Sequence, residues 1–361
     1  MMLPDIFFLK HLLQCASVTP DDAGCMDVIA QYLQTTPINY HQGDTNNSYF
    51  ELGTGDTLFL FVGHTDVVPP GPLDYWDNHP FSCQETNPII ARGIVDMKGA
   101  IWAFCHALKT VQHKLKGRVG ILLTSDEEGD GQNGMQSVIP KLQQQGFLAQ
   151  WALVGEPTCV NNIGDYYKHE RRGSYTFNIT LKGQQGHTAY PDQAWSPNTA
   201  LSQFLISLQH LQETLPEHHN ISLFSVNTST STSNIIPQSI SIGLNLRYFS
   251  KNTIKQCMTV FQQHHAAIQE KPGALPYQAK PIRLKEALEQ AVASVTGLTP
   301  QASIKGGTSD ARFLKPIAQE IIEFGLRSEY AHKINEQATE TELHQLTNIY
   351  QELLLNLLSK T

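Results

Sequence analysis

Three short stretches of the chain consist almost entirely of apolar residues. They cover residues 58–62, 119–124 and 151–154. Apolar runs of this length are typical of parallel strands that are buried on both faces. Residues 98–115, between the first two runs, have apolar positions at helical spacing (Ile101, Phe104, Cys105 and Leu108). This order predicts an α/β domain with a largely parallel central sheet flanked by helices.

The pattern changes at Gly173 to a strict alternation of apolar and polar residues. The apolar positions are Tyr175, Phe177, Ile179 and Leu181. Such alternation indicates a strand with one solvated face. The sequence then predicts a helix at 197–211, strands near 221–226 and 240–248, a helix at 253–268 and an extended segment ending near Lys280. Strand, helix, strand, strand, helix, strand is the order of a ferredoxin-like α+β domain.

The α/β pattern resumes after this insertion. It comprises a helix at 284–295, a glycine-rich loop at 306–307, a strand at 321–324 and a terminal helix from Glu340. We therefore predict one domain from residues 1–172 and 283–361, interrupted by a second at 173–282. Residues 1–15 mix apolar and charged side chains and predict an amphipathic helix, not a signal peptide.

Length, charge and cysteine content narrow the class of protein. The 361 residues are enough for two domains. The net charge of −8 and the lack of a basic block argue against nucleic acid or an anionic membrane as partner. No apolar run is long enough to predict a transmembrane helix. Six scattered cysteines without a CxxC spacing indicate reduced thiols and a cytoplasmic location.

Acidic and imidazole side chains follow the apolar runs or open the first long helix. They are His64, Asp66, Asp96, Glu127, Glu128 and Glu156. Because the carboxyl ends of parallel strands meet at one edge of a sheet, we expect these side chains to lie together. His64 and Asp66 are two apart, so in extended backbone the Asp66 carboxylate would accept one imidazole proton while the other nitrogen binds metal.

Taken singly, these residues have simpler interpretations. Asp66 is also typical of a cap beside a turn histidine, Asp96 of a helix N-cap, and the Glu127–Glu128 pair of a solvated acidic turn. A single late histidine such as His332 is more often structural. Together, however, His, Asp and Glu without Cys suit zinc or cobalt. Five such ligands exceed one tetrahedral ion and favour two ions about 3.5–4 Å apart.

With these residues in view, the chain resembles the zinc-dependent aminoacylase and carboxypeptidase family of co-catalytic metallohydrolases. Eight strings carry the resemblance in the family's order along nearly the whole chain. They are GHTDVVPPG (63–71), RGIVDMKG (92–99), TSDEEGDG (124–131), GEPT (155–158), RRGS (171–174), GQQGHTAYP (183–191), NIIP (234–237) and GGTSDARF (306–313). The first four are typical of the family, and RRGS, GQQGHTAYP and GGTSDARF point to a branch that removes succinyl groups.

The resemblance implies a role for each residue of the metal site. Asp96 would bridge two Zn²⁺ ions, for which Co²⁺ can substitute. His64 and Glu156 would complete one ion, and Glu128 and His332 the other. Glu127 would be the general base, and Asp66 would orient His64.

The resemblance also implies a reaction and a partner. The branch hydrolyses the amide of N-succinyl-LL-2,6-diaminopimelate to succinate and LL-2,6-diaminopimelate, a step toward lysine. The inserted domain would form a homodimer in which His187 acts in the active site of the partner subunit. Seven residues fall where the family contacts substrate: Arg171, Ser174, Tyr190, Asn234, Arg247, Gly307 and Thr308.

One departure from the family concerns the substrate. Ser328 stands where the family has an Asn that touches substrate, which leaves acyl-group and amine selectivity open. Three other interpretations compete. A related deacylase such as acetylornithine deacetylase would share the metals and the base. A metal-dependent binding protein would keep the fold without activity, and a structural α/β protein would bind no zinc tightly.

Overall fold

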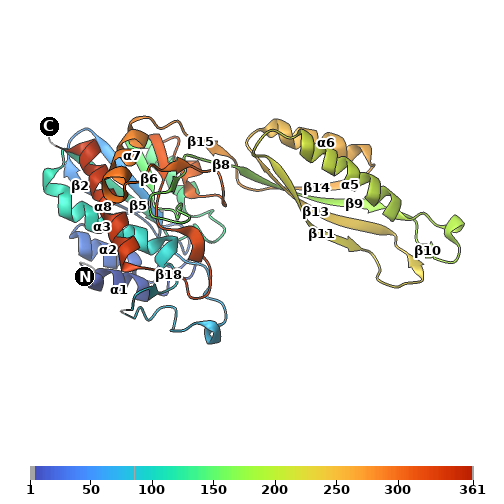
Figure 1. Ribbon diagram of the computed structural model, residues 1–361, viewed down its shortest axis with the longest axis horizontal. Coiled ribbons are helices and arrows are strands. Elements are labelled where there is room, and N and C mark those ends of the chain that lie inside the picture. The colour runs from blue at the N-terminus through green and yellow to red at the C-terminus, as the bar shows by residue number, and fades with distance from the viewer. Residues whose placement is uncertain (1–4, 85, 360–361) are drawn as a thin grey trace. The chain divides into compact units, whose positions relative to one another are not determined.

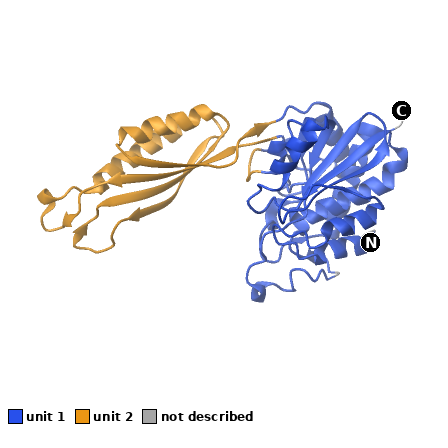
Figure 2. Ribbon diagram, turned by 180° about the vertical axis from the view of Figure 1, so that it is seen from behind, with its two compact units in different colours: residues 1–169, 279–303, 309–361 blue, residues 170–278, 304–308 orange. Residues whose placement is uncertain are grey.

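The computed structural model describes residues 5–84 and 86–359, which form two compact units (Figure 1, Figure 2). Within the described residues, the first unit comprises 5–169, 279–303 and 309–359, and the second comprises 170–278 and 304–308. The predicted boundaries at 172 and 283 fall within a few residues of the observed ones. Residues 304–308, which the sequence placed in the first domain, group with the second unit. This segment joins the second unit, where Arg171 Nη1 donates to the Gly307 carbonyl at 2.9 Å.

A six-stranded sheet lies at the centre of the first unit. Its order is β1 (Ile38–Asn39), β2 (Asn47–Thr54), β5 (Gly117–Thr124), β3 (Leu58–His64), β6 (Ala149–Val154) and β17 (Ala318–Glu323). β5, β3, β6 and β17 are parallel, which confirms the predicted α/β class, while β1 and β2 add an antiparallel edge. All seven residues of β3 are buried, as its unbroken apolar run predicts.

Six α-helices belong to this unit in the described residues: α1 (Ile6–Gln14), α2 (Cys25–Leu33), α3 (Gly99–Val111), α4 (Met135–Gln144), α7 (Arg283–Thr296) and α8 (Glu340–Leu358). α3 is almost wholly buried and packs against α8. Phe61 of β3 stacks on Phe104 of α3 with ring centroids 4.2 Å apart, which fixes the helix on the sheet. The Tyr350 hydroxyl of α8 donates to the Phe324 carbonyl at 2.7 Å. These contacts hold the carboxyl ends of the strands in place.

The second unit is a four-stranded antiparallel sheet with two helices. Its elements are β9 (Gly173–Lys182), α5 (Pro197–Thr214), β11 (Asn220–Thr228), β13 (Ser239–Tyr248), α6 (Lys251–Gln263) and β14 (Ala267–Pro272). The sheet order β11-β13-β9-β14 and the chain order together confirm the predicted ferredoxin-like fold. Figure 1 shows both helices on one face of the sheet, where Phe177, Phe204 and Phe261 form the centre of the core.

The end of the second helix and the position of the fourth strand in this unit were predicted wrongly. The second helix ends at Gln263, not at residue 268, because His265 adopts a left-handed conformation with φ of 51°. The fourth strand is therefore β14 at Ala267–Pro272, earlier than the extended segment predicted near Lys280.

The structure also describes the state of the cysteines and the character of the helices. All six cysteines are free, and only Cys15 is not fully buried. Over the described residues, no helix has the length and apolar character needed to cross a membrane. The cytoplasmic location stays a prediction.

Candidate metal centre

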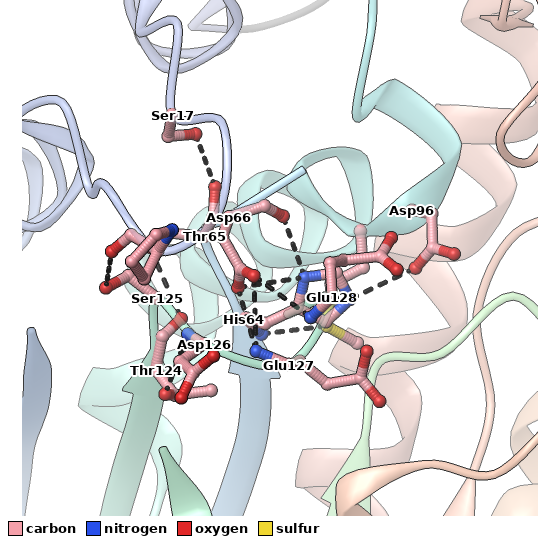
Figure 3. Close-up of polar contacts among 12 residues, drawn as sticks. Ser17, His64, Thr65, Asp66, Asp96, Thr124, Ser125, Asp126, Glu127 and Glu128 are labelled. Atoms are coloured by element: carbon pink, nitrogen blue, oxygen red, sulfur yellow. Dashed lines mark hydrogen bonds and ion pairs between the residues drawn. The ribbon is translucent and has the colours of Figure 1, made fainter. Parts of the chain in front are cut away.

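Three adjacent strands of the first unit deliver the predicted acidic and imidazole residues to one edge of the sheet. β3 ends at His64, β5 ends two residues before Asp126, and β6 ends two residues before Glu156. β3 pairs in parallel with both β5 and β6, so the three carboxyl ends are neighbours. Figure 3 shows His64, Asp66, Asp96, Glu127 and Glu128 gathered there. The structure thus brings these five predicted residues together at one edge of the sheet.

The imidazole of His64 is oriented by a main-chain carbonyl. Its Nδ1 lies 2.9 Å from the Asp66 carbonyl oxygen and 3.6 Å from the Asp66 carboxylate. A carbonyl can only accept, so Nδ1 carries a proton. Nε2 faces Asp96 Oδ1 at 3.1 Å. The nearest acceptor is thus the carbonyl of Asp66, with the carboxylate of the same residue further away, and the role of Asp66 as the residue that orients His64 stays a prediction.

The Asp66 carboxylate instead holds the turn that follows β5. It accepts from the amide of Glu127 at 3.2 Å and from the amide of Glu128 at 3.0 Å (Figure 3). The Asp66 side chain is fully buried, so these charge-assisted bonds are shielded from solvent. Asp66 thereby fixes the backbone of both the predicted base and a predicted ligand.

Asp96 lies between two histidines. Its Oδ1 is 3.1 Å from His64 Nε2, and its Oδ2 is 3.1 Å from His332 Nε2. His332 Nε2 is also 2.6 Å from Glu128 Oε1. One donor atom each from His64, Asp96 and Glu128 lies within 4.8 Å of the others. A carboxylate whose two oxygens face two different histidines has the arrangement that a bridge between two ions requires.

These contacts shift the pKa values of His332 and Asp96. Hydrogen bonds with Asp96 and then Glu128 raise the pKa of His332 to about 10. Burial alone would raise the pKa of Asp96, but the bonds from His332 and His64 hold it below its usual range. His332 also has a left-handed backbone with φ of 63°, which is uncommon for a residue other than glycine.

Glu127 and Glu156 complete the acidic rim. Burial of its carboxyl, followed by the charge of Glu156, raises the pKa of Glu127 well above its ordinary value. The side chain of Glu156 is 8% exposed. Within the described part of the chain, Glu156 is not among the donors that lie within 4.8 Å of one another. The structure thus brings four of the five predicted ligands into direct contact and places the fifth close enough to influence the base.

Two buried acids of this unit were not assigned a role from the sequence. Asp310 is 5% exposed, its Oδ2 has no hydrogen-bond partner, and burial raises the pKa of its carboxyl to about 7. Glu336 is fully buried and bonds to the segment that carries Asp96. Asp310 falls within the GGTSDARF string, which could have drawn attention to it. No sequence motif marks Glu336, and its position four residues after His332 is all that connects it with the site in the sequence.

The remaining predicted residues all belong to the second unit. β10 (Gly186–His187) pairs with β12 (Ile235–Ile236), and the Thr188 amide donates to the Asn234 carbonyl at 3.1 Å. His187 and Tyr190 are exposed. The Ala189 amide donates to His187 Nδ1 at 3.0 Å. A neutral His187 ring therefore carries its proton on Nε2 and presents a donor there.

The arginines of the second unit surround the start of β9. Arg171 is buried and held by the Gly307 carbonyl, which is next to Thr308. Arg247 of β13 lies opposite Ser174 of β9 and opposite Asn220 of β11. Arg172, which sequence reasoning missed, donates from Nη1 to Asn220 Oδ1 at 3.4 Å. Its guanidinium therefore lies beside the strand pair that carries Arg247.

Known proteins share both the sequence and the fold. Residues 60–356 match Peptidase family M20/M25/M40. The succinyl-diaminopimelate desuccinylase of Methylococcus capsulatus is 35% identical over 371 residues, covering 97% of each chain. That of Nitrosococcus oceani is 35% identical over 370 residues, covering 97% of this chain and 98% of the relative. An M20 family metallo-carboxypeptidase from Sulfolobus solfataricus superposes with a TM-score of 0.76 at 16% identity, covering 98% and 99% of the two chains.

The chain belongs to Peptidase family M20/M25/M40. This confirms the expectation of a metal-dependent amidohydrolase, and the family implies a divalent metal. The donor atoms of His64, Asp96 and Glu128 fit such a metal, because imidazole and carboxylate groups suit a borderline dication.

Proposed function

We propose that this protein hydrolyses the amide of N-succinyl-LL-2,6-diaminopimelate to succinate and LL-2,6-diaminopimelate, using two Zn²⁺ ions that Co²⁺ can replace. The observation that carries the proposal is the placement of the Asp96 carboxylate between His64 and His332. The choice of substrate is supported by two relatives named succinyl-diaminopimelate desuccinylase, which are 35% identical to this chain over almost its whole length.

Five residues would hold the ions. Asp96 would contact both, His64 and Glu156 would complete one, and Glu128 and His332 the other. When bound, two zinc ions lower the pKa of a water molecule to about 7 and polarise the amide carbonyl. The geometry of the chain supports this, because His64 directs Nε2 toward the Asp96 carboxylate while its Nδ1 is held by the Asp66 carbonyl.

Glu127 would move the proton. It is not among the donors in contact with Asp96, and its raised pKa gives the carboxylate a stronger affinity for a proton taken from water. The same carboxyl would then deliver the proton to the leaving amine. Asp66 keeps Glu127 in place through the amide of Glu127 itself.

His187 would supply a donor to the carbonyl oxygen as negative charge develops there. Its free Nε2–H supports this role, because Nδ1 is occupied by the Ala189 amide. We propose that this histidine acts in the site of the partner subunit of a homodimer. His187 is exposed, as a residue that serves another chain must be.

An unpaired sheet edge supports the homodimer. β11 pairs with β13 and with no other described strand, so its second edge is open. The strand exposes Leu223, Phe224 and Val226 by 43%, 59% and 43%. An apolar open edge is a site where a second copy of the same strand can add.

The two carboxylates of the amino acid and the succinyl carboxylate would be bound by residues of the second unit. Arg171 and Arg247 would provide charge, since a guanidinium pairs with a carboxylate in bidentate geometry. Ser174, Tyr190, Asn234, Gly307 and Thr308 would supply further contacts. Arg247 has no carboxylate partner among the described residues, so its charge is available to an anionic substrate.

A direct comparison of substrates tests the proposal. Purified protein of known metal content is offered N-succinyl-LL-2,6-diaminopimelate and N-acetylornithine in parallel, and kcat/KM is measured for each. We expect the succinyl substrate to be preferred by about a hundredfold or more, because a site built for a polar group rejects substrates that lack it. The comparison of substrates is needed because Ser328 stands where the family has an Asn that touches substrate. The Ser328 hydroxyl instead donates to the Cys159 carbonyl at 3.3 Å. Preference for acetylornithine, or absence of bound metal, would overturn the proposal.

A further inference from the structure

One buried carboxylate joins the segments that carry two of the predicted metal ligands. Glu336 is 0% exposed. Its Oε2 accepts from Arg92 Nη1 at 2.7 Å and from the Gly93 amide at 3.0 Å. Its Oε1 accepts from the Val95 amide at 2.8 Å and from the Asp96 amide at 3.1 Å. Both oxygens are therefore fully used, each by two donors.

These donors all come from the segment that leads into Asp96. Glu336 itself lies four residues after His332 on a segment about 240 positions away in the chain. Arg92 makes a second connection between the two segments, because its Nη1 also donates to the carbonyl of Lys333 at 3.1 Å. Arg92 is in turn held over the Trp76 ring at 5.1 Å. The backbones next to Asp96 and His332 are thus tied together by one ion pair and its hydrogen bonds.

A carboxylate is required in this position. Three backbone N–H groups and a guanidinium converge on it, and a buried donor left without an acceptor costs about 1–3 kcal/mol. A glutamine would turn an NH₂ group toward donors at one of the two oxygen positions. The neutral side chain would therefore leave donors unpaired and release the backbone of Asp96.

We propose that Glu336 is a positioning residue of the metal centre. It holds the backbone of Asp96 so that the two carboxylate oxygens face His64 and His332, and it thereby sets the affinity for both ions. The inference rests on the metal-dependent function proposed above. Glu336 itself touches neither the ions nor the substrate in this account.

The test compares two glutamates that each accept several backbone amides. Glu336→Gln and Glu336→Asp change the residue in question. Glu320→Gln is the matched control, because Glu320 accepts from the amides of Ile282, Arg283 and Leu284 at 2.9, 3.3 and 2.8 Å. Those bonds hold the start of α7 and touch no predicted ligand segment.

Metal binding is the readout, measured without substrate. Metal-free protein is titrated with Zn²⁺ in competition with a coloured chelator, and the visible spectrum of the Co²⁺ form reports the ligand geometry. We expect Glu336→Gln to bind at least about tenfold more weakly, as is typical when a residue behind a ligand is lost. Its Co²⁺ spectrum should also change. Glu336→Asp keeps the charge and should recover part of the affinity. Glu320→Gln should lower the unfolding temperature but leave Zn²⁺ affinity and the spectrum unaltered.

Distinct results separate this inference from the proposed function. If the wild-type protein binds no zinc tightly, the proposed function fails. If the wild type binds zinc and Glu336→Gln binds it as tightly with the same Co²⁺ spectrum, only the role of Glu336 fails. An equal loss in Glu320→Gln, or loss of fold in both Glu336 variants, would make Glu336 a structural residue and also overturn the inference.

Discussion

The two units hold their predicted functional residues in different ways. In the first unit, Asp96 is bonded to two histidines, its backbone is held by Glu336, and the turn with Glu127 and Glu128 is held by Asp66. In the second unit, His187 and Tyr190 are exposed and are supported by main-chain bonds of a short loop. The side chains of the first arrangement contact one another within their own unit. In the second arrangement, the side chains of His187 and Tyr190 are exposed to solvent.

This difference predicts which part of the proposed chemistry would depend on assembly. A cluster whose donors already contact one another can bind metal without a partner chain. Exposed donors acquire a role only when another surface meets them. Changes in the first unit should therefore affect metal binding or proton transfer, and changes in the second should reduce turnover while leaving the metal in place.

The largest effect is expected for Glu127→Gln in the first unit. The substitution keeps the size of the side chain but removes the proton acceptor, so kcat should fall by about a thousandfold. Zinc content should remain at the wild-type level, because Glu127 is not among the contacting donors. Steady-state kinetics measures kcat, and elemental analysis of the same preparation measures the zinc content. Near-normal turnover would refute the assignment of the base.

A smaller loss is expected for His187→Ala in the second unit. Removal of one donor to a developing oxyanion typically costs about a hundredfold in kcat. The zinc content should again be unchanged. Heterodimers of one Glu127→Gln chain and one His187→Ala chain, purified through two different tags, should recover about half of the wild-type activity, because one of two symmetric sites has both groups intact. Heterodimers as inactive as the parents would show that His187 does not act across the interface.

Assembly should depend on the open edge of the second unit. Phe224→Glu places a charge on β11 and is expected to convert the dimer into monomer with a several-fold loss of activity, because like charges would meet across the joined strands. Phe7→Glu on α1 is the matched control, since Phe7 is 70% exposed in the first unit. Light scattering after size-exclusion chromatography gives the mass of each. A monomeric wild type, or monomer formation in the Phe7 variant alone, would contradict the proposed interface.

The smallest effect concerns stability and pH in the metal-free protein. Burial raises the pKa of Asp310 from 3.8 to about 7, so the folded state holds this proton more tightly than the unfolded state. Stability should therefore fall as pH rises from about 4 to about 7. Asp310→Asn removes this cost and should raise the unfolding temperature by a few degrees at about pH 8, with no gain below about pH 4.

Glu270→Gln is the control in the second unit. Glu270 is exposed and accepts from the Tyr175 hydroxyl at 2.6 Å. It should give no gain in unfolding temperature at either pH. Thermal unfolding followed by circular dichroism measures both variants, and an Asp310→Asn protein that is less stable at about pH 8 would argue against a buried charge at this position.

The sequence predicted those parts of the fold that depend on continuous apolar burial. β3, β5 and β6 were found because both faces of each strand are covered, and the residues after them were therefore predicted to share a rim. β14 was misplaced because its residues are mostly exposed and carry no alternating signal. β2 was missed because its buried residues include Asn47 and Ser48, so the strand has few apolar residues in its sequence.

The same reasoning explains what was found and missed in the site. His332 follows a short 3-10 helix and has no pattern that marks it, so only resemblance to a family indicated it. His187 depended on resemblance for the same reason. The contact of Glu336 with the Asp96 amide joins residues 240 positions apart, and no local pattern predicts such a bond. The sequence also assigned the Asp66 carboxylate to His64, because spacing alone does not tell a side-chain oxygen from a main-chain oxygen.

We propose that the first unit binds two metal ions that share the Asp96 carboxylate. Calorimetric titration of the metal-free protein with Co²⁺ tests it most directly, with Asp96→Asn as the paired variant. We expect two ions per chain in the wild-type protein and a weakening of both binding events in Asp96→Asn, because each oxygen of this carboxylate faces a different histidine. A single ion per wild-type chain, or two ions bound by Asp96→Asn with unaltered affinity, would contradict it.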